Sequence, residues 1–155
     1  MLGRLAKWLR LMGYDTCYER DITDDALLLE ARKEGRTILT RDTRLIMRRA
    51  ARGQALLITS NDPAMQLRQV MEHFSLAALD IPRCSRCNGL LIRVPDKHQL
   101  RDLVPEHVFL NQGREGFFRC SSCGRIYWEG SHAAGIRSKK KAALMTGKKE
   151  SGGNR

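Results

Sequence analysis

Four of the five cysteines form two Cys-x-x-Cys pairs, Cys84 with Cys87 and Cys120 with Cys123, and 32 residues separate the two pairs. Structural zinc takes four ligands in a tetrahedron, and two short turns joined by a longer excursion bring such ligands together. Two disulfides or a redox dithiol are the alternatives, and disulfides are disfavoured because the chain shows no secretion signal. The spacing therefore predicts a structural zinc site, in which four thiolates leave no position for an activated water.

Residues around these cysteines add detail to the prediction. Asn88 and Gly89 follow the first pair and Gly124 follows the second, and we expect the glycines to adopt the backbone angles that a tight turn requires. Cys17 is interpreted as a small buried residue of a strand, with a reactive thiol as the alternative. His132 is a fifth candidate ligand, or else a residue that faces solvent or RNA.

Carboxylates follow three predicted strands. Asp24 and Asp25 come after the first strand, Asp42 directly after the second and Asp62 after the third, while Asp21 lies in the same loop as Asp24. Ligands of an open parallel sheet bind beyond the carboxyl ends of its strands, where converging carboxylates can hold Mg²⁺ or Mn²⁺. Such a metal activates a water and neutralises charge on a phosphodiester. Helix N-capping is the alternative explanation for these residues, because Asp is favoured at that position.

Helices and short strands alternate up to about residue 75 and must position these carboxylates. Apolar residues at spacings of three and four predict the first helix, and Asp62–Pro63 predicts an N-cap followed by a proline in the first turn. The expected helices are Leu2–Met12, Thr23–Gly35, Asp42 to near Gly53, and Asp62–Phe74, and the expected strands are Tyr14–Tyr18, Arg36–Thr40 and Ala55–Thr59. We expect an α/β fold in which a parallel sheet carries helices on both faces, with the third strand buried on both sides.

A linker over residues 76–83 separates this part from a region of different composition. Cysteines and glycines appear after Pro82, and long apolar helices disappear. This pattern predicts a small β zinc ribbon, which the metal holds together because the module has little core of its own. The segments with strand character are Leu90–Val94, Phe117–Arg119 and Arg125–Trp128.

The net charge of +11 is unevenly distributed. Residues 1–82 carry a net charge of +2, residues 83–132 carry +3 and residues 133–155 carry +6. The last segment contains Lys139, Lys140 and Lys141. We expect it to be a disordered tail that binds polyanions, the alternative being a solvated tail that aids solubility. The predicted domains are therefore an α/β domain over residues 1–80, a zinc ribbon over 83–132 and a basic tail over 133–155.

The composition also bears on the cellular environment. Hydrophobic residues make up 42% of the chain, which is enough to build a packed core. No apolar run approaches the roughly 18 residues that a membrane-spanning helix needs. We therefore expect a soluble, cytoplasmic protein with no membrane partner.

Several ordered motifs together resemble one known family. The segment Leu2–Asp15, LGRLAKWLRLMGYD, is close to its opening signature, and the segments Asp24–Leu27 and Leu39–Asp42 resemble its acidic core. The segments Cys84–Gly89 and Cys120–His132 are similar to its metal-binding region. Further similarities are Ala31, Glu34–Arg36, Asp62–Pro63, Gln66–Leu67 and Val104–Pro105. Residues 1 to about 132 therefore resemble the PIN-like RNase domain with a carboxy-terminal zinc ribbon, the Mut7-C RNAse domain family.

The resemblance implies a PIN-like, Rossmann-like fold and a ribonuclease that cuts single-stranded RNA at an acidic Mg²⁺ or Mn²⁺ site. By motif matching, Asp24 and Asp42 are the acidic-site residues, helped by Asp25 or Asp62. Members of the family usually have a strand ending in Asp just before the Leu-Gly-Arg segment. We therefore expect the first strand to be missing here, either because the chain begins late or because the protein lacks that strand and one metal ligand.

RNA is the expected partner. Arg4, Arg41 and the lysines of the tail are candidates for holding its phosphate backbone, with the zinc ribbon aiding binding. Ribosomal RNA or tRNA is the expected kind of RNA. The alternative function is a non-catalytic RNA- or ribosome-binding protein with a degenerate PIN-like domain. A third hypothesis is a module in which the ribbon docks a protein.

Overall fold

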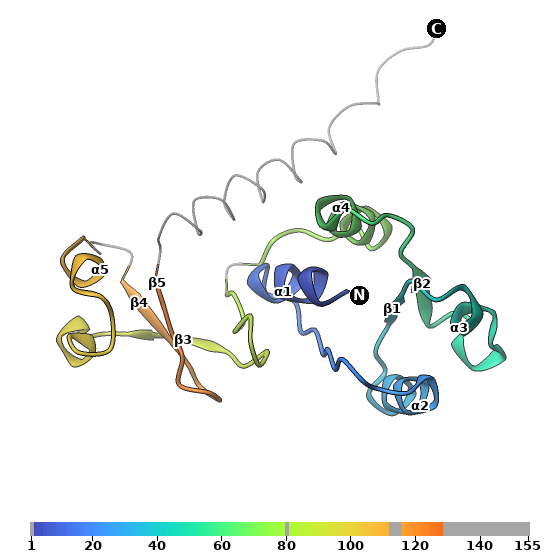
Figure 1. Cartoon of the computed structure of the whole chain (residues 1–155), viewed down its shortest axis with the longest axis horizontal. Helices are drawn as coiled ribbons and strands as arrows, with labels where there is room; N and C mark the ends of the chain where they lie inside the picture. The colour runs from blue at the N-terminus through green and yellow to red at the C-terminus, as the bar shows by residue number, and fades with distance from the viewer. Residues whose placement is uncertain (1, 80, 112–115, 129–155) are drawn as a thin grey trace, which may run out of the picture.

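The computed structural model describes residues 2–79, 81–111 and 116–128, and these contain two separate sheets (Figure 1). Helices and short strands alternate in the first half, up to residue 79, whereas the second half is built on three antiparallel strands. The residues predicted to form the basic tail lie outside the described part. The chain is thus a small α/β structure with a parallel two-stranded sheet and an antiparallel sheet.

The helices of the first half and two of its three predicted strands form in the predicted order, and capping side chains set where three of the helices begin. Thr23 is the N-cap of the second helix and accepts a hydrogen bond from the Ala26 N–H. Asp42 and Asp62 cap the next two α-helices of this half in the same way. The elements are α1 (Gly3–Leu11), α2 (Asp24–Glu34), β1 (Ile38–Thr40), α3 (Thr43–Met47), the 3₁₀ turn η1 (Arg49–Ala51), β2 (Ala55–Leu57) and α4 (Pro63–His73).

Strands β1 and β2 pair in parallel, with Ile38 opposite Ala55 and Leu39 opposite Leu56. Successive side chains of a strand point to opposite faces. Ile38 and Ala55 accordingly join an apolar cluster with residues of α2 and α3, whereas Leu39 and Leu56 pack against a cluster built from α1, α4 and Ile58. The prediction that helices cover both faces of the sheet is therefore confirmed (Figure 1).

The strand predicted over Tyr14–Tyr18 is wrong. These residues are in irregular structure, and side chains bind the backbone of Thr16: its N–H donates to Asn88 Oδ1 at 3.1 Å, and its carbonyl accepts from Arg10 Nε at 2.7 Å. Backbone groups bound in this way do not pair with a neighbouring strand. Cys17 lies exposed in this segment, so its interpretation as a buried residue is also wrong.

The third predicted strand forms, but its burial was predicted wrongly. Ile58 is buried, while the residues of β2 are half-buried and Thr59 is exposed. A strand is covered on both faces and both edges only inside a wide sheet. The described parallel sheet has two strands, so β2 has just one neighbour there.

The second half confirms the three predicted strands. Strand β4 pairs antiparallel with β3 on one side and with β5 on the other, and Leu91 lies opposite Cys120. The elements of this half are β3 (Leu91–Val94), the 3₁₀ turn η2 (Lys97–Leu100), α5 (Glu106–Asn111), β4 (Phe117–Cys120) and β5 (Ile126–Trp128). The cysteine pairs thus lie at the ends of these strands.

A compact apolar cluster fills the space between η2, α5 and the antiparallel sheet. Its buried residues are Leu100, Val104, Val108, Phe109 and Phe117. The sequence prediction credited this half with little core of its own and no long apolar helix. The helix α5 is short, but the cluster is a core that the prediction missed.

None of the described helices is long and apolar enough to cross a membrane. The domain limits predicted at residues 80 and 83 stay predictions.

Candidate functional site

The four paired cysteines converge in the folded chain. The sulfur atoms of Cys84, Cys87, Cys120 and Cys123 all lie within 4.8 Å of one another. The Sγ atoms of Cys84 and Cys123 are 3.7 Å apart, and those of Cys87 and Cys120 are 3.4 Å apart. Four sulfur ligands at the corners of so small a volume suit zinc, which prefers thiolates in a closed tetrahedron. The predicted ligand set is therefore brought together, and the cysteines are positioned to bind one metal ion.

Backbone N–H groups point at the two buried sulfurs of the cluster. Cys84 and Cys120 are almost fully buried, whereas Cys87 and Cys123 are exposed. The N–H of Cys87 lies 3.4 Å from Cys84 Sγ, and the N–H groups of Ser122 and Cys123 lie 3.4 Å from Cys120 Sγ. These donors stabilise negative sulfur, as a thiolate ligand requires.

Gly89 leaves room for the second cysteine pair. A Cβ added there would lie 2.5 Å from Ser122 Oγ and 2.9 Å from Cys120 Sγ. Larger side chains would therefore push the second cysteine pair away from the first. The prediction that Gly89 supplies left-handed backbone is wrong, because Asn88 takes that conformation with φ 71°. At the second pair Gly124 does supply it, with φ 69°.

The thiols of the cluster differ in pKa. Burial tends to raise the pKa of Cys84, but hydrogen bonds from the Tyr127 hydroxyl and from backbone N–H groups lower it to about 6. The Gly89 backbone tends to lower the pKa of Cys87, but its contacts with Cys120 and the other thiols raise it to about 12. The pKa of one thiol is thus lowered where that of its neighbour is raised, and a divalent metal bound by the cluster would favour the ionised form of the thiols.

The first cysteine pair is bound to the first half of the chain. The guanidinium of Arg10, on α1, donates to the carbonyls of Ser85 and Arg86 at 3.2 and 3.1 Å. The Asn88 side chain accepts from the Thr16 N–H and donates to Asp15 Oδ1 at 2.7 Å. Sequence reasoning missed this contact, since nothing local links residues more than seventy positions apart.

The carboxylates Asp42 and Asp62 are helix caps in the structure. Asp42 Oδ1 accepts from the N–H groups of Arg44 and Leu45 at 2.7 and 3.3 Å. Asp62 Oδ1 accepts from two N–H groups at the start of α4, both at 2.9 Å. Both caps use Oδ1, and within the described residues the Oδ2 atoms make no hydrogen bond. The capping explanation is thus confirmed for both residues, and one oxygen of each stays available.

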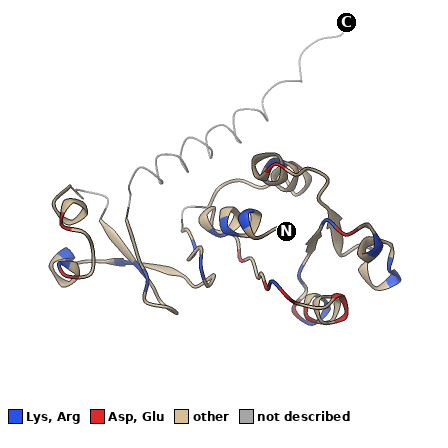
Figure 2. Ribbon diagram, in the orientation of Figure 1, with Lys and Arg blue, Asp and Glu red and all other residues tan. Residues whose placement is uncertain are grey.

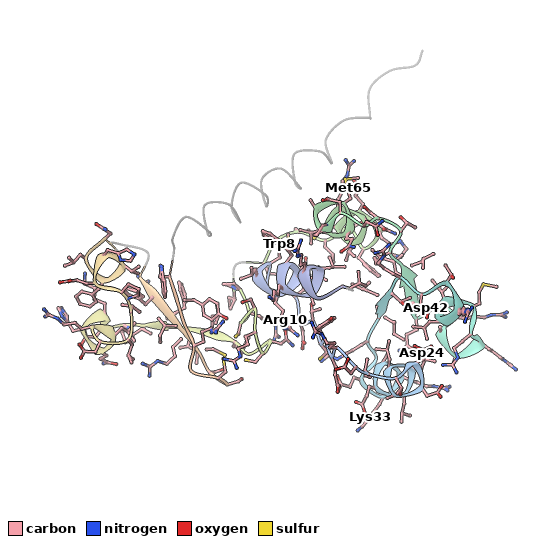
Figure 3. All side chains as sticks on the ribbon, viewed as in Figure 1. Trp8, Arg10, Asp24, Lys33, Asp42 and Met65 are labelled. Carbon is pink, nitrogen blue, oxygen red and sulfur yellow. The ribbon has the colours of Figure 1, made fainter. Side chains whose placement is uncertain are left out.

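Asp24 and Asp25 lie in the first turn of α2 and face an arginine. Arg48, which ends α3, places Nη2 2.8 Å from Asp25 Oδ1 and Nη1 4.0 Å from Asp24 Oδ2. Figure 3 labels Asp24 on α2 and Asp42 at the start of α3. Arg48 follows the last residue of α3, so its pairs place the start of α2 near the end of α3 opposite to Asp42. Exposed pairs of this kind contribute about 0–1 kcal/mol.

In the part of the chain that the structure describes, the four cysteines are the only group of three or more His, Cys, Asp or Glu side chains close enough to hold a metal together. Asp24 and Asp25 thus share one arginine, but the described carboxylates form no three-ligand cluster. His132 lies outside the described residues.

The predicted RNA-binding residues have different surroundings. Arg4 is exposed on α1. Arg41 is half-buried next to Asp42, and its Nε is buried with no hydrogen-bond partner among the described residues. Leaving a buried donor unpaired costs about 1–3 kcal/mol, so an anion bound here would remove a real penalty. The lysines Lys139, Lys140 and Lys141 lie outside the described residues.

Charges are distributed differently along the helices of the first half. Acidic residues gather along α2 and the loop before it, whereas α1 and α3 carry arginines and a lysine (Figure 2). Between Arg41 and Arg52 the chain has five arginines, four of them exposed. An acidic helix and a basic segment thus meet at the Arg48 pairs.

Comparison with known proteins identifies the family. The sequence model of the Mut7-C RNAse domain matches residues 1–140, which extends the predicted resemblance beyond residue 132. No curated protein and no solved structure matches the chain. The family is defined by an RNase domain, which indicates an RNase-related function and an interaction with RNA. Because the match spans most of the sequence, the chain belongs to the Mut7-C RNAse domain family.

Proposed function

We propose that this protein is a metal-dependent ribonuclease that hydrolyses single-stranded RNA at the acidic residues of its first half. The observation that carries the proposal is the family match over residues 1–140. The reaction places a water oxygen on phosphorus, breaks the bond to one ribose oxygen and leaves that oxygen with a proton. Mg²⁺ or Mn²⁺ would orient and deprotonate the water and neutralise phosphodiester charge when bound.

Asp24 and Asp42 would hold this metal, helped by Asp25 or Asp62. Asp42 can do so through Oδ2, because capping of α3 uses Oδ1. Asp24 and Asp25 would exchange their contacts with Arg48 for the metal, which costs little because the pair is exposed. Oxygen ligands of this kind suit Mg²⁺ and Mn²⁺.

The arginines around Asp42 would hold the RNA backbone. Arg41 has a buried Nε without a described partner, and a phosphate oxygen is the acceptor that a guanidinium fork matches best. Exposed neighbours in the same segment and Arg4 on α1 extend the positive surface. The neighbours are Arg44, Arg48, Arg49 and Arg52. The lysines of residues 133–155 would recruit RNA by charge without sequence preference.

This proposal includes a PIN-like fold for the first half, a structural zinc in the second half and a cytoplasmic site of action. Ribosomal RNA or tRNA would be the partner. The zinc would hold the ribbon that aids RNA binding, since four thiolates leave no open coordination position.

Substituting Asp42→Asn tests the catalytic proposal. Asparagine caps a helix as well as aspartate does, so the fold is kept while the charge is lost. With a labelled single-stranded RNA and Mn²⁺ or Mg²⁺, we expect cleavage to fall at least 100-fold. Asp96→Asn is the matched control, because Asp96 caps η2 through Oδ1 in the other half. Equal cleavage by Asp42→Asn and the wild type would refute the proposal.

A second candidate function is RNA binding without cleavage. It is favoured by the absence of a three-carboxylate cluster among the described residues. It predicts binding that weakens steeply with salt, because phosphate contacts release counterions, and that falls when residues 137–155 are removed. If the wild type and a chain extended by an upstream strand ending in Asp both fail to cleave RNA, this second function stands. Salt-independent binding would exclude it.

A further inference from the structure

We propose that Arg10 is a positioning residue of the cysteine metal centre, which couples metal binding to the order of residues 10–16 in the first half of the chain. The proposal does not depend on the ribonuclease function, and its tests measure metal affinity and amide exchange. It rests on contacts between α1 and the first cysteine pair, Cys84 and Cys87.

The side chain of Arg10 joins three separate pieces of backbone. Its Nε donates to the Thr16 carbonyl at 2.7 Å, and its Nη1 donates to the carbonyls of Ser85 and Arg86 at 3.2 and 3.1 Å. Ser85 and Arg86 are the two residues between Cys84 and Cys87, so the guanidinium binds the turn that presents two of the four sulfurs. Figure 3 labels Arg10 on α1.

Burial makes this contact energetically important. Only 6% of Arg10 is exposed, and its partners among the described residues are neutral carbonyls. A buried cation is costly unless opposite charge lies near it. Four thiolates around one divalent ion carry a net charge of about −2. The metal centre therefore offers the guanidinium a compensating charge, and the guanidinium stabilises the anionic centre in return.

The acidic group nearest to this turn has other cations to neutralise it. Asp15 accepts from Asn88 Nδ2 at 2.7 Å, but it is paired with Arg36 at 3.1 Å and with Arg83 at 3.7 Å. Asp15 thus helps to hold Asn88 in its left-handed conformation and is already matched in charge. Arg10 plays a different part, because it contacts the turn directly.

Two further hydrogen bonds connect the first half of the chain to the second. The Thr16 N–H donates to Asn88 Oδ1 at 3.1 Å, and the Arg83 N–H donates to the Arg10 carbonyl at 2.8 Å. When the metal draws Cys84 and Cys87 together, the turn takes the shape that these groups bind. Without the metal the turn loses that constraint, and the segment 10–16 loses its partners.

Zinc affinity of Arg10 variants tests the positioning role. In competition with a chromophoric zinc chelator, we expect Arg10→Met to bind zinc about 10- to 100-fold more weakly than the wild type. Arg10→Lys keeps the positive charge but not the planar guanidinium, so its loss of zinc affinity should be smaller than that of Arg10→Met. Arg4→Met, an exposed change on the same helix, should leave the affinity unchanged. An Arg10→Met affinity within twofold of the wild type overturns the proposal.

Amide exchange of the wild-type chain gives a test that needs no variant. The reporters are the Thr16 and Arg83 amides, and the reference is the Ile58 amide, which donates to the Thr40 carbonyl in the parallel sheet. We expect chelation of zinc to remove protection at both reporters, with or without loss at Ile58. Reporters that stay protected in zinc-free protein overturn the coupling. This measurement decides the question even if Arg10→Met fails to fold.

Discussion

The two candidate metal sites of this chain were both predicted from residue types and their spacing, yet the fold brings together the ligands of only one of them among the described residues. The cysteines of the second half meet within 4.8 Å, whereas the four candidate carboxylates of the first half cap helices or face Arg48. Each cysteine pair is a short local turn, and β4 ends at Cys120, the first cysteine of the second pair, opposite Leu91 at the start of β3. The carboxylates come from three loops, and only the packing of a whole sheet could bring them together.

This difference shows that an aspartate at a helix start has two possible explanations. An aspartate after a strand serves equally well as a cap and as a metal ligand, because both roles use a carboxylate oxygen. Two Cys-x-x-Cys pairs have fewer explanations, which are a metal site or disulfides. Residue type, more than spacing, therefore made one prediction specific and the other ambiguous.

The largest effect should come from removing one metal ligand. Cys120→Ser should abolish stoichiometric zinc binding, and with it the order of the second half, because structural zinc contributes about 10–16 kcal/mol in small domains. Metal analysis should return about one zinc per wild-type chain and almost none for the variant. Cys17→Ser is the control, since Cys17 lies exposed outside the cluster. Zinc retained at full stoichiometry by Cys120→Ser would show that the four cysteines are not the zinc ligands.

Crowding the metal centre should have a smaller effect. In Gly89→Ala the new methyl group meets Ser122 Oγ and Cys120 Sγ, and overpacking of this kind costs about 1–3 kcal/mol. Urea unfolding of the zinc-loaded protein measures this loss, and chelator competition measures a matching fall in zinc affinity. Gly53→Ala is the comparison. A Cβ there meets nothing within 4 Å, so the alanine is strained only by the left-handed φ of 73°. Equal zinc affinities in the two variants would contradict the crowding.

The contact of Asp15 with Asn88, which connects the two halves, should make the free energy of unfolding depend on pH. Hydrogen bonds from Asn88 and Arg36 lower the pKa of Asp15 below its ordinary value of 3.8. Its contribution is therefore present above that value and is lost as pH falls through the lowered pKa. We expect the stability difference between wild type and Asp15→Asn to shrink between pH 6 and pH 2, as urea unfolding would measure. A difference that stays constant would show that the carboxylate charge does not act.

The smallest effect should come from the exposed arginine at the acidic residues. Arg48→Met removes both pairs and should change the unfolding free energy by less than about 1 kcal/mol. If Asp24 and Asp25 belong to a metal site, the same change should strengthen Mn²⁺ binding several-fold, since a competing cation is lost. Titration with Mn²⁺ in the zinc-loaded protein measures this. Arg44→Met is the control, because Arg44 makes no ion pair with the described residues, and equal affinities would exclude competition by Arg48.

Much of the first half could be predicted from sequence. Helix starts at Thr23, Asp42 and Asp62 follow from capping chemistry, which acts within three residues. The segment Tyr14–Tyr18 could not be predicted, because its backbone is bound by Asn88 and Arg10 and not by a neighbouring strand. The burial of β2 was misjudged because an apolar run does not reveal how wide its sheet is.

The sequence by itself determined which residues could ligate metal, where the helices of the first half begin and to which family the chain belongs. These depend on residue type and on neighbours close along the chain. Tertiary structure alone decided that Arg10 binds the turn between Cys84 and Cys87, and that Arg48 faces Asp24 and Asp25. Such contacts depend on the path of the whole backbone, because groups far apart in sequence meet only when packing of the apolar clusters places their elements side by side.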